Sequence, residues 1–237
     1  MKIIGHRGAR GEAPENTLGG FQYLRDLGVR AVEFDVRQLK DNCLTVIHDD
    51  NFLRTAGLPH PLYECVESDL VHYDHRHQWA NWPKTENTPK LQQVLSLLND
   101  FEHIEVEIKP VTTLPEAEKL TLSLEQQLEG LEQQVTITSF DEKVLSSLQQ
   151  QRSRFKRGLL VEDDIKSKAI EKAHHLGCSH IGWMDQLATP EMIQLSHLAQ
   201  LNISVWTVNS IERAKALRDA GVQGLITDIP KTMQSQL

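Results

Sequence analysis

Short apolar, β-branched runs alternate along the chain with longer segments whose apolar residues recur every three or four positions. Runs of the first kind predict strands and segments of the second kind predict helices, and their alternation is typical of a parallel sheet with crossover helices. Nine runs predict strands: KIIG at 2–5, AVEFDV at 31–36, CLTVIH at 43–48, HIEVEI at 103–108, VTITSF at 135–140, RGLLV at 157–161, SHIGW at 179–183, ISVWTV at 203–208 and GLIT at 224–227. Helices are predicted at 17–27, 91–98, 115–128, 141–150, 165–176, 190–201 and 210–220.

The predicted fold class follows from how these runs can be joined. The second and third strand-like runs lie too close together for a parallel crossover, which needs a dozen residues or more. They are therefore predicted to form a hairpin whose turn is Asp41-Asn42, two residue types that tolerate positive φ. If the residues that flank this turn pair with each other, Asp35 lies opposite His48. We therefore predict an α/β fold, a (β/α)8 or TIM barrel with an extra β-hairpin arm.

Residues 49–90 show no sustained periodicity. An irregular connection of this length inside a compact domain is usually a functional lid or a small inserted subdomain. We predict an insertion that caps one end of the barrel, within a single domain that spans 1–237. A disordered linker is the alternative, and the tryptophans and short apolar pieces of the segment argue against it. Its histidines His72, His75 and His77 are expected to be exposed or loop residues.

Composition and charge narrow the class of protein. The chain has 237 residues, of which 39% are hydrophobic and 24% charged, as in a soluble globular protein. It has no run of ~18 apolar residues and only a short apolar start, so we expect a cytoplasmic protein with no stable membrane insertion. The formal net charge of −8 argues against a nucleic-acid partner and leaves room for a cation. Cys43, Cys65 and Cys178 form no CxxC pair and are expected to be free thiols.

Carboxylates alternate with apolar residues in two of the predicted strands. The alternation puts Glu33 and Asp35 on one face of AVEFDV, and it puts Glu105, Glu107 and Lys109 on one face of HIEVEIK. If the apolar faces pack on helices, the carboxylates point into the barrel, where like charges repel unless a proton or a cation neutralises them. A set of oxygen ligands suits Mg²⁺ or Ca²⁺ better than zinc. Exposed edge strands with solvated acids are the alternative.

Two histidines and two further cationic residues complete a candidate site. His6 ends the first predicted strand and His48 ends the hairpin arm, and in α/β barrels the reacting groups lie at the C-terminal ends of strands. Arg7 and Lys109 could hold phosphate oxygens, so that the set supplies an acid, a base and a charge clamp for phosphoryl chemistry. A structural role is the alternative for either histidine taken alone.

Several segments together resemble one enzyme family. GHRGARGEAPENT, VEFDVRQLKDN, LTVIHD, FLRTAG, VEIKP, ITSF, VWTVN and GLITDIP occur in this order along nearly the whole chain and are similar to segments of the glycerophosphodiester phosphodiesterases of the bacterial cytoplasmic type. The resemblance implies a barrel with a small insertion after the first HD pair, and a divalent cation. It also implies these roles: Glu33, Asp35 and Glu107 as metal ligands, His6 and His48 as the catalytic acid–base pair, and Arg7 and Lys109 as phosphate-binding residues.

Other residues of these segments have two interpretations each. Trp206 either forms an apolar wall for the glycerol carbons or belongs to the core. Glu15 either contacts the metal or supports its ligands, whereas Asn16 is expected to be structural, at the start of the first helix. Asp228 either hydrogen-bonds within the site or caps a turn. Glu105 stands where an uncharged polar residue is expected in many relatives, and it either tightens cation binding or points aside.

We expect an enzyme, a phosphoric diester hydrolase that cleaves glycerophosphodiesters to sn-glycerol 3-phosphate and an alcohol. One histidine would take a proton from the nucleophile, which is water or the substrate's own 2-hydroxyl, and the other would protonate the leaving alcohol. The first alternative is a lysophospholipase D or a phosphoinositide-type phosphodiesterase, which would need an apolar or basic rim to meet its lipid substrate. The second is a catalytically inactive barrel that binds a ligand, and the complete set of candidate residues argues against it.

Overall fold

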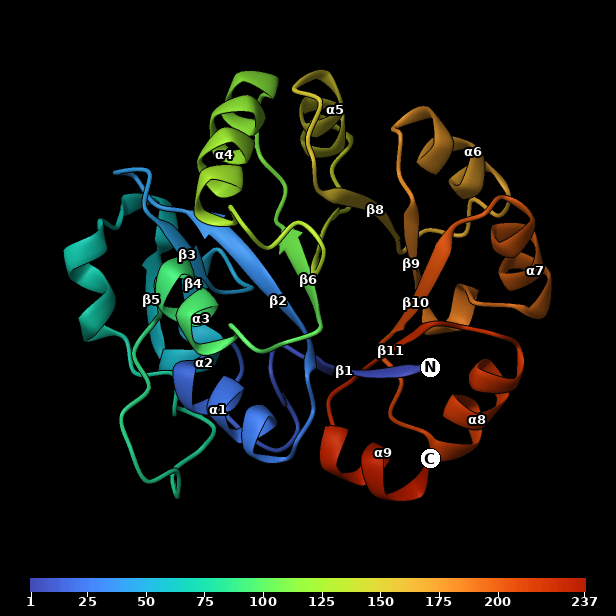
Figure 1. The fold of residues 1–237 in the computed structure, drawn as a ribbon. Coiled ribbons are helices and arrows are strands. Elements are labelled where there is room, and N and C mark those ends of the chain that lie inside the picture. The colour runs from blue at the N-terminus through green and yellow to red at the C-terminus, as the bar shows by residue number, and fades with distance from the viewer.

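Eight parallel strands form a closed barrel that is surrounded by helices (Figure 1). The computed structural model describes all residues 1–237. The barrel strands are β1 (Lys2–His6), β2 (Ala31–Gln38), β6 (His103–Ile108), β7 (Val135–Ser139), β8 (Lys156–Val161), β9 (His180–Met184), β10 (Asn202–Trp206) and β11 (Gly224–Thr227). They pair in the order β1-β11-β10-β9-β8-β7-β6-β2, and β1 closes the circle against β2. The predicted (β/α)8 barrel is thereby confirmed.

Helices cover the outer, apolar faces of the strands. At the N-terminus of the first helix, the Thr17 side chain accepts a hydrogen bond from the Gly20 N–H and so caps the helix. Phe21 of this helix meets Phe34 of β2 edge to face, with the ring centroids 5.7 Å apart. The outer helices are α1 (Leu18–Asp26), α3 (Leu91–Leu97), α4 (Leu114–Gln127), α5 (Glu142–Gln150), α6 (Lys168–His175), α7 (Pro190–Leu198), α8 (Ile211–Asp219) and α9 (Pro230–Gln236), of which α9 was not predicted.

Strand β3 (Leu44–Val46) lies outside the barrel and pairs antiparallel with the end of β2, as the predicted hairpin requires. Its register differs from the predicted one. Asp35 lies opposite Ile47, whose N–H donates to the Asp35 backbone oxygen at 3.1 Å, so the prediction that Asp35 faces His48 is wrong by one residue. The cause is a loop of three residues instead of two, in which Asn42 adopts a φ of 71°.

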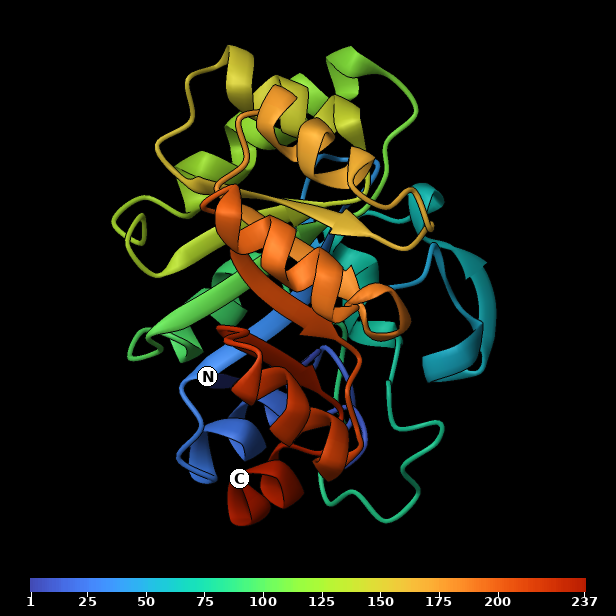
Figure 2. The same ribbon diagram turned by 90° about the vertical axis from the view of Figure 1, so that its right-hand side faces the viewer.

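Residues 49–90 form a small unit with its own apolar cluster. Its elements are β4 (Asn51–Phe52), α2 (Leu53–Ala56), β5 (Leu58–Pro61) and the 3-10 helices η1 (Leu62–Glu64) and η2 (Glu67–His72). Phe52 stacks on Tyr73 with a centroid distance of 3.5 Å, and Leu39 and Ile47 of the hairpin arm join the same cluster. Figure 2 shows this unit on the side of the molecule toward which the arrowheads of the barrel strands point. The insertion therefore stands at the end of the barrel where active sites of this fold lie.

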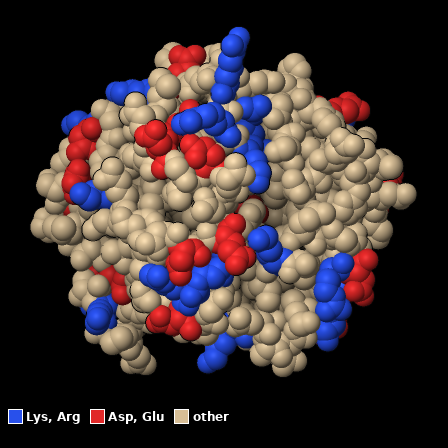
Figure 3. Space-filling model, viewed as in Figure 1, with Lys and Arg blue, Asp and Glu red and all other residues tan.

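Charge, membrane-spanning potential and the cysteines complete the description of the fold. On the face drawn in Figure 3, lysine and arginine side chains are interspersed with aspartate and glutamate. No helix of the chain combines the length and the apolar character that a bilayer crossing needs. The three cysteines are free, and Cys65 and Cys178 are buried.

Candidate active site

Three carboxylates meet inside the barrel near the C-terminal ends of two neighbouring strands. The register pairs Asp35 of β2 with Glu107 of β6, and Glu33 lies two residues before Asp35 on the same face of β2. The three residues each offer one oxygen, these oxygens lie within 4.8 Å of one another, and all three side chains are buried. The structure thus brings together the three residues that were predicted as metal ligands.

Burial and the repulsion between neighbouring carboxylates shift the pKa values of this cluster. Burial, together with the charges of Asp35 and Glu107, raises the pKa of Glu33 well above its usual value. Burial and the Asp35 charge raise the pKa of Glu107 to about 7. Burial also tends to raise the pKa of Asp35, but the charges of Lys109 and Arg7 outweigh it and hold that pKa far below its usual range. Three crowded oxygen ligands whose charges repel are the donor set that a hard divalent cation such as Mg²⁺ or Ca²⁺ fits.

Lys109 and Arg7 lie against the same carboxylates. The Lys109 Nζ is 2.7 Å from Asp35 Oδ1 and also contacts Glu107. The Arg7 Nε is 3.2 Å from Asp35 Oδ2, and the Arg7 backbone N–H donates to Glu33. Arg7 and the following Gly8 have φ values of 50° and 89°, so the chain bends sharply as soon as β1 ends. This bend keeps the guanidinium beside the acidic cluster.

Each candidate histidine has a carboxylate at its Nδ1. The His6 Nδ1 lies 2.7 Å from Asp228 Oδ1, and the His48 Nδ1 lies 2.6 Å from Asp49 Oδ1. Burial tends to raise the pKa of Asp228, but its hydrogen bond with His6 lowers that pKa to about 2, so the carboxylate is ionised and accepts a hydrogen bond from the His6 Nδ1–H. Burial lowers the pKa of His6. Both imidazoles are therefore held with Nε2 left for other partners, and the His6 Nε2 is 3.9 Å from Glu33.

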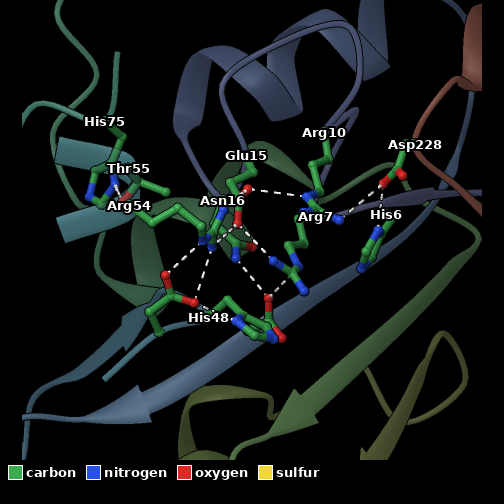
Figure 4. A network of polar contacts seen from close by, with 12 residues as sticks. His6, Arg7, Arg10, Glu15, Asn16, His48, Arg54, Thr55, His75 and Asp228 are labelled. Carbon is green, nitrogen blue, oxygen red and sulfur yellow. Dashed lines mark hydrogen bonds and ion pairs between the residues drawn. The ribbon is translucent and has the colours of Figure 1, made fainter. Parts of the chain in front are cut away.

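A polar network joins the first loop of the barrel to the insertion (Figure 4). Glu15 sits at its centre, 2.8 Å from Arg7 and 3.3 Å from Arg10. Arg54 of helix α2 also contacts Glu15, at 2.6 and 2.8 Å, and it reaches Asp49 with the other edge of its guanidinium. Burial tends to raise the pKa of Glu15, but the hydrogen bond from Arg54 and the Arg7 charge bring it to about 2. Glu15 thus supports the site through arginines and lies outside the carboxylate cluster.

Asn16 and Glu105 lie near the carboxylate cluster, and the structure decides the role of each. The Asn16 side chain donates to Asp35 Oδ2 at 2.8 Å, so it contacts a candidate metal ligand directly and its role is more than helix initiation. Glu105 points aside: its oxygens lie 3.0 Å from His103, 3.6 Å from His180 and within hydrogen-bond reach of the Ser204 hydroxyl. Of the two interpretations of Glu105, the structure supports the second.

Trp206 lies at the C-terminal end of β10 and is partly buried. Its indole Nε1–H donates to the Gly182 backbone oxygen at 3.1 Å, and its ring meets the Phe140 ring edge to face with a centroid distance of 5.4 Å. Phe140 directly follows β7 and Trp206 ends β10, two strands that β8 and β9 separate in the barrel. Together they offer an apolar surface at the same end of the barrel as the carboxylates.

Arg54 and Asp49 are the members of the site that the sequence did not single out. Asp49 follows His48 directly, so an adjacent carboxylate was visible in the sequence, but nothing local shows that it turns back onto the imidazole. Arg54 reaches Glu15, which is 39 residues away along the chain, only because α2 docks at the end of the barrel. A contact of that kind depends on tertiary structure and leaves no periodic pattern.

Comparisons with known proteins agree on one family. A family model described as the glycerophosphoryl diester phosphodiesterase family matches residues 6–232. A glycerophosphodiester phosphodiesterase of Bacillus altitudinis is 27% identical over 97% of this chain and 95% of the relative, and a human lysophospholipase D is 27% identical over 100% of this chain and 86% of the human protein. The structure of an Oleispira antarctica phosphodiesterase in complex with the product sn-glycerol-3-phosphate has a TM-score of 0.89 and 23% identity, over 100% of this chain and 96% of that protein.

Proposed function

Because the chain belongs to the glycerophosphoryl diester phosphodiesterase family and is a phosphodiesterase of that family, we propose that it hydrolyses glycerophosphodiesters to sn-glycerol 3-phosphate and an alcohol. The observation that carries the proposal is the meeting of three buried carboxylates with two carboxylate-oriented histidines at one end of the barrel. The complex of the Oleispira antarctica relative with sn-glycerol-3-phosphate supports the proposed product.

Glu33, Asp35 and Glu107 would hold a divalent cation, Mg²⁺ or Ca²⁺, and this cation would supply positive charge to the phosphate oxygens as the transition state forms. Arg7 and Lys109 lie against the same carboxylates and would bind further phosphate oxygens, Arg7 through the guanidinium N–H groups that Glu15 leaves unused. These contacts would fix the phosphorus at the C-terminal end of β2 and β6.

His6 and His48 would move the protons of the reaction. One imidazole accepts a proton from the nucleophile, either water or the glycerol 2-hydroxyl, while the nucleophile's oxygen forms its bond to phosphorus. The other donates a proton to the oxygen of the leaving alcohol as its bond to phosphorus breaks. When the 2-hydroxyl is the nucleophile, the product of this step is a cyclic phosphodiester, and water then attacks its phosphorus while the bond to the 2-oxygen breaks and that oxygen regains a proton, with the two imidazoles in reversed roles. Asp228 and Asp49 keep the Nδ1 of each ring occupied, so that Nε2 performs the transfer. The rings of Trp206 and Phe140 would pack against the glycerol carbons.

The insertion gives a specific reason to consider a lipid substrate as the second candidate. It carries four exposed large apolar residues, which are Leu53, Leu58, Tyr63 and Val71. Figure 2 places it at the end of the barrel that holds the site, and a human relative is a lysophospholipase D. Exposed apolar residues beside an active site are what an enzyme that meets lipid requires. A lysophospholipase D activity would release choline from lysophosphatidylcholine and leave the glycerol esterified.

A substrate panel separates these functions. The purified protein is incubated with glycerophosphocholine, glycerophosphoethanolamine and lysophosphatidylcholine, and sn-glycerol 3-phosphate and choline are measured. The proposed function predicts sn-glycerol 3-phosphate from the first two substrates. Choline from lysophosphatidylcholine alone would favour the second candidate, and no release from any substrate would indicate a ligand-binding barrel.

Removal of the cation is the companion test. Exhaustive treatment with EDTA is expected to abolish hydrolysis of glycerophosphocholine, because three mutually repelling carboxylates without a cation supply negative charge where the phosphate needs positive charge. Mg²⁺ or Ca²⁺ added in excess of the chelator is expected to restore the rate, and whichever ion restores more identifies the preferred metal. Full activity in excess EDTA would refute the cation-dependent mechanism.

A further inference from the structure

We propose that Arg54, in helix α2 of the insertion, is a positioning residue of the active site. Through Asp49 it orients His48, and through Glu15 it orients Arg7. The proposal rests on the proposed function of His48 and Arg7. It gives the insertion a part in catalysis beyond covering the end of the barrel.

The Arg54 guanidinium is almost fully used by two carboxylates. Its Nε and Nη2 lie 2.8 and 3.1 Å from the two oxygens of Asp49, and its Nη1 and Nη2 lie 2.6 and 2.8 Å from the two oxygens of Glu15. These two bidentate contacts use four of the five N–H donors of the guanidinium. Arg54 therefore has one N–H donor left for a substrate phosphate, whereas Arg7 donates one N–H to Glu15.

Each of the two carboxylates connects Arg54 to a residue with a role in the proposed reaction, Asp49 to His48 and Glu15 to Arg7. Asp49 Oδ1, which receives an Arg54 N–H, is 2.6 Å from the His48 Nδ1. Glu15 Oε1, which also receives an Arg54 N–H, accepts from Arg7 Nη1 at 2.8 Å. One side chain from the insertion thus fixes the partners of two site residues that come from different segments of the chain (Figure 4).

His48 depends on this support more than His6 does. The His48 side chain is 35% exposed, whereas the His6 side chain is 10% exposed and enclosed by the barrel. Packing therefore restrains the His48 ring weakly, and its bond to Asp49 is its main restraint. Because a displacement of about 1 Å in a reacting group can lower a rate by about 10²-fold, the orientation of Asp49 has a direct bearing on turnover.

The position of α2 is itself fixed, which a positioning role requires. A helix of four residues cannot hold its own geometry. Thr55, the neighbour of Arg54, lies 2.8 Å from the buried His75 Nδ1, and the Nε2 of the same ring lies 2.6 Å from Thr88. The ring of His75 thus pins α2 to the end of the insertion where the chain returns to the barrel.

The substitution Arg54→Lys separates geometry from charge. Lysine keeps the positive charge that an anionic substrate meets but cannot form two planar forks. We expect kcat to fall ~10- to 100-fold with KM within about threefold of the wild-type value. Arg76→Lys is the matched control, because Arg76 forms a similar fork with Asp74 in the same insertion without contacting the site, and it is expected to leave kcat unchanged.

A double-mutant cycle tests whether Arg54 acts through Asp49. Asp49→Asn is expected to lower kcat by a similar factor. The double variant is expected to lose clearly less than the product of the two single losses, because only the part of the Arg54 effect that runs through Glu15 and Arg7 remains to be lost. Circular dichroism and the melting temperature of each variant are measured beside the kinetics. If Arg54→Lys is poorly folded, Asp49→Asn carries the test, since it leaves the Arg54 fork on Glu15 in place.

Each variant is assayed with glycerophosphocholine and with bis(p-nitrophenyl) phosphate, an activated diester without glycerol. Cleavage of the second substrate alone would refute the proposed natural substrate while still reporting the effect of Arg54. The positioning role would be overturned by a kcat for Arg54→Lys within twofold of wild type, by full additivity in the cycle, or by an equal loss in Arg76→Lys.

Discussion

At the scale of single residues, the two histidines share one arrangement although they come from different parts of the fold. His6 leaves a barrel strand and meets Asp228, which follows β11, whereas His48 follows the outer strand β3 and meets its own neighbour Asp49. Each carboxylate fixes the tautomer of its imidazole, with the proton on Nδ1 and the lone pair of the neutral ring on Nε2. In the proposed mechanism, two histidines that are held in the same way could exchange the roles of acid and base without a change of structure.

Replacement of either histidine tests that pair. His6→Ala and His48→Ala are each expected to lower kcat by ~10²–10⁴-fold, the usual contribution of one general acid or base. The measurement is steady-state hydrolysis of glycerophosphocholine, with circular dichroism to show that the fold is retained. Phe140→Leu serves as a control outside the proton path, with a smaller expected loss. Retention of near-wild-type turnover by both histidine variants would remove them from the mechanism.

The alternation of polar and apolar residues put Glu33 and Asp35 on one face of their strand and Glu105 and Glu107 on one face of theirs, and the family resemblance then selected Glu107 as a metal ligand. The register that sets Asp35 beside Glu107 comes from the structure. Glu105 shares their face by the same rule, but His180 and Ser204 reach it from the far side of the barrel and hold it away from the others. Only the closed barrel brings those partners close, so no local pattern could have shown the difference.

At the scale of elements, long regular segments were predictable and short ones were not. The eight barrel strands and seven outer helices each carry a sustained hydrophobic period, and their predicted positions agree with the structure to within a few residues. The elements of the insertion span two to six residues, and they do not alternate with helices of sustained period as the barrel strands do. The register of the hairpin is one residue off the prediction because the turn has three residues and Asn42 adopts a positive φ, a local detail that no hydrophobic period reports.

The burial of His75 in the insertion could not be predicted from the sequence. It makes the stability of the protein depend on pH. His75 lies in a turn, but it is buried between Thr55 and Thr88 and not exposed, and burial lowers its pKa from 6.5 to about 4. The unfolded chain takes up a proton at this ring below pH 6.5 while the folded chain does not until about pH 4. The stability that the neutral ring contributes is therefore full above pH 6.5 and is lost as the pH falls toward 4.

The variant His75→Gln removes this titration. Between pH 7 and pH 5 the free energy of unfolding of the wild type is expected to fall by ~2 kcal/mol more than that of the variant, from the linkage of one group with these two pKa values. The measurement is urea unfolding of both proteins at the two pH values. Because the carboxylates titrate in both proteins, their contribution cancels in the comparison. Parallel pH dependence in the two proteins would contradict the buried neutral state of His75.

At the scale of the whole molecule, the buried carboxylates that repel one another lie together at one end of the barrel. The closed sheet buries Glu33 and Glu107 beside Asp35 at the end of the strands, and their raised pKa values record the free energy that ionising them requires. A ligand that binds only the folded state increases the free energy of unfolding by mass action. The proposed cation is such a ligand, so that occupation of the site and stability of the whole fold should be linked.

Thermal unfolding measures this link without reference to activity. Mg²⁺ or Ca²⁺ added to EDTA-treated protein at ~100 times its dissociation constant is expected to contribute ~2.7 kcal/mol, which corresponds to a rise in melting temperature of about 5–10 °C for a chain of this size. Glu107→Gln should abolish the rise, because it removes one of the three proposed ligands. Glu105→Gln is the matched control on the same strand and should keep it, whatever its own melting temperature, since Glu105 faces His180. A rise that survives Glu107→Gln, or that Glu105→Gln removes, would place the cation elsewhere in the barrel.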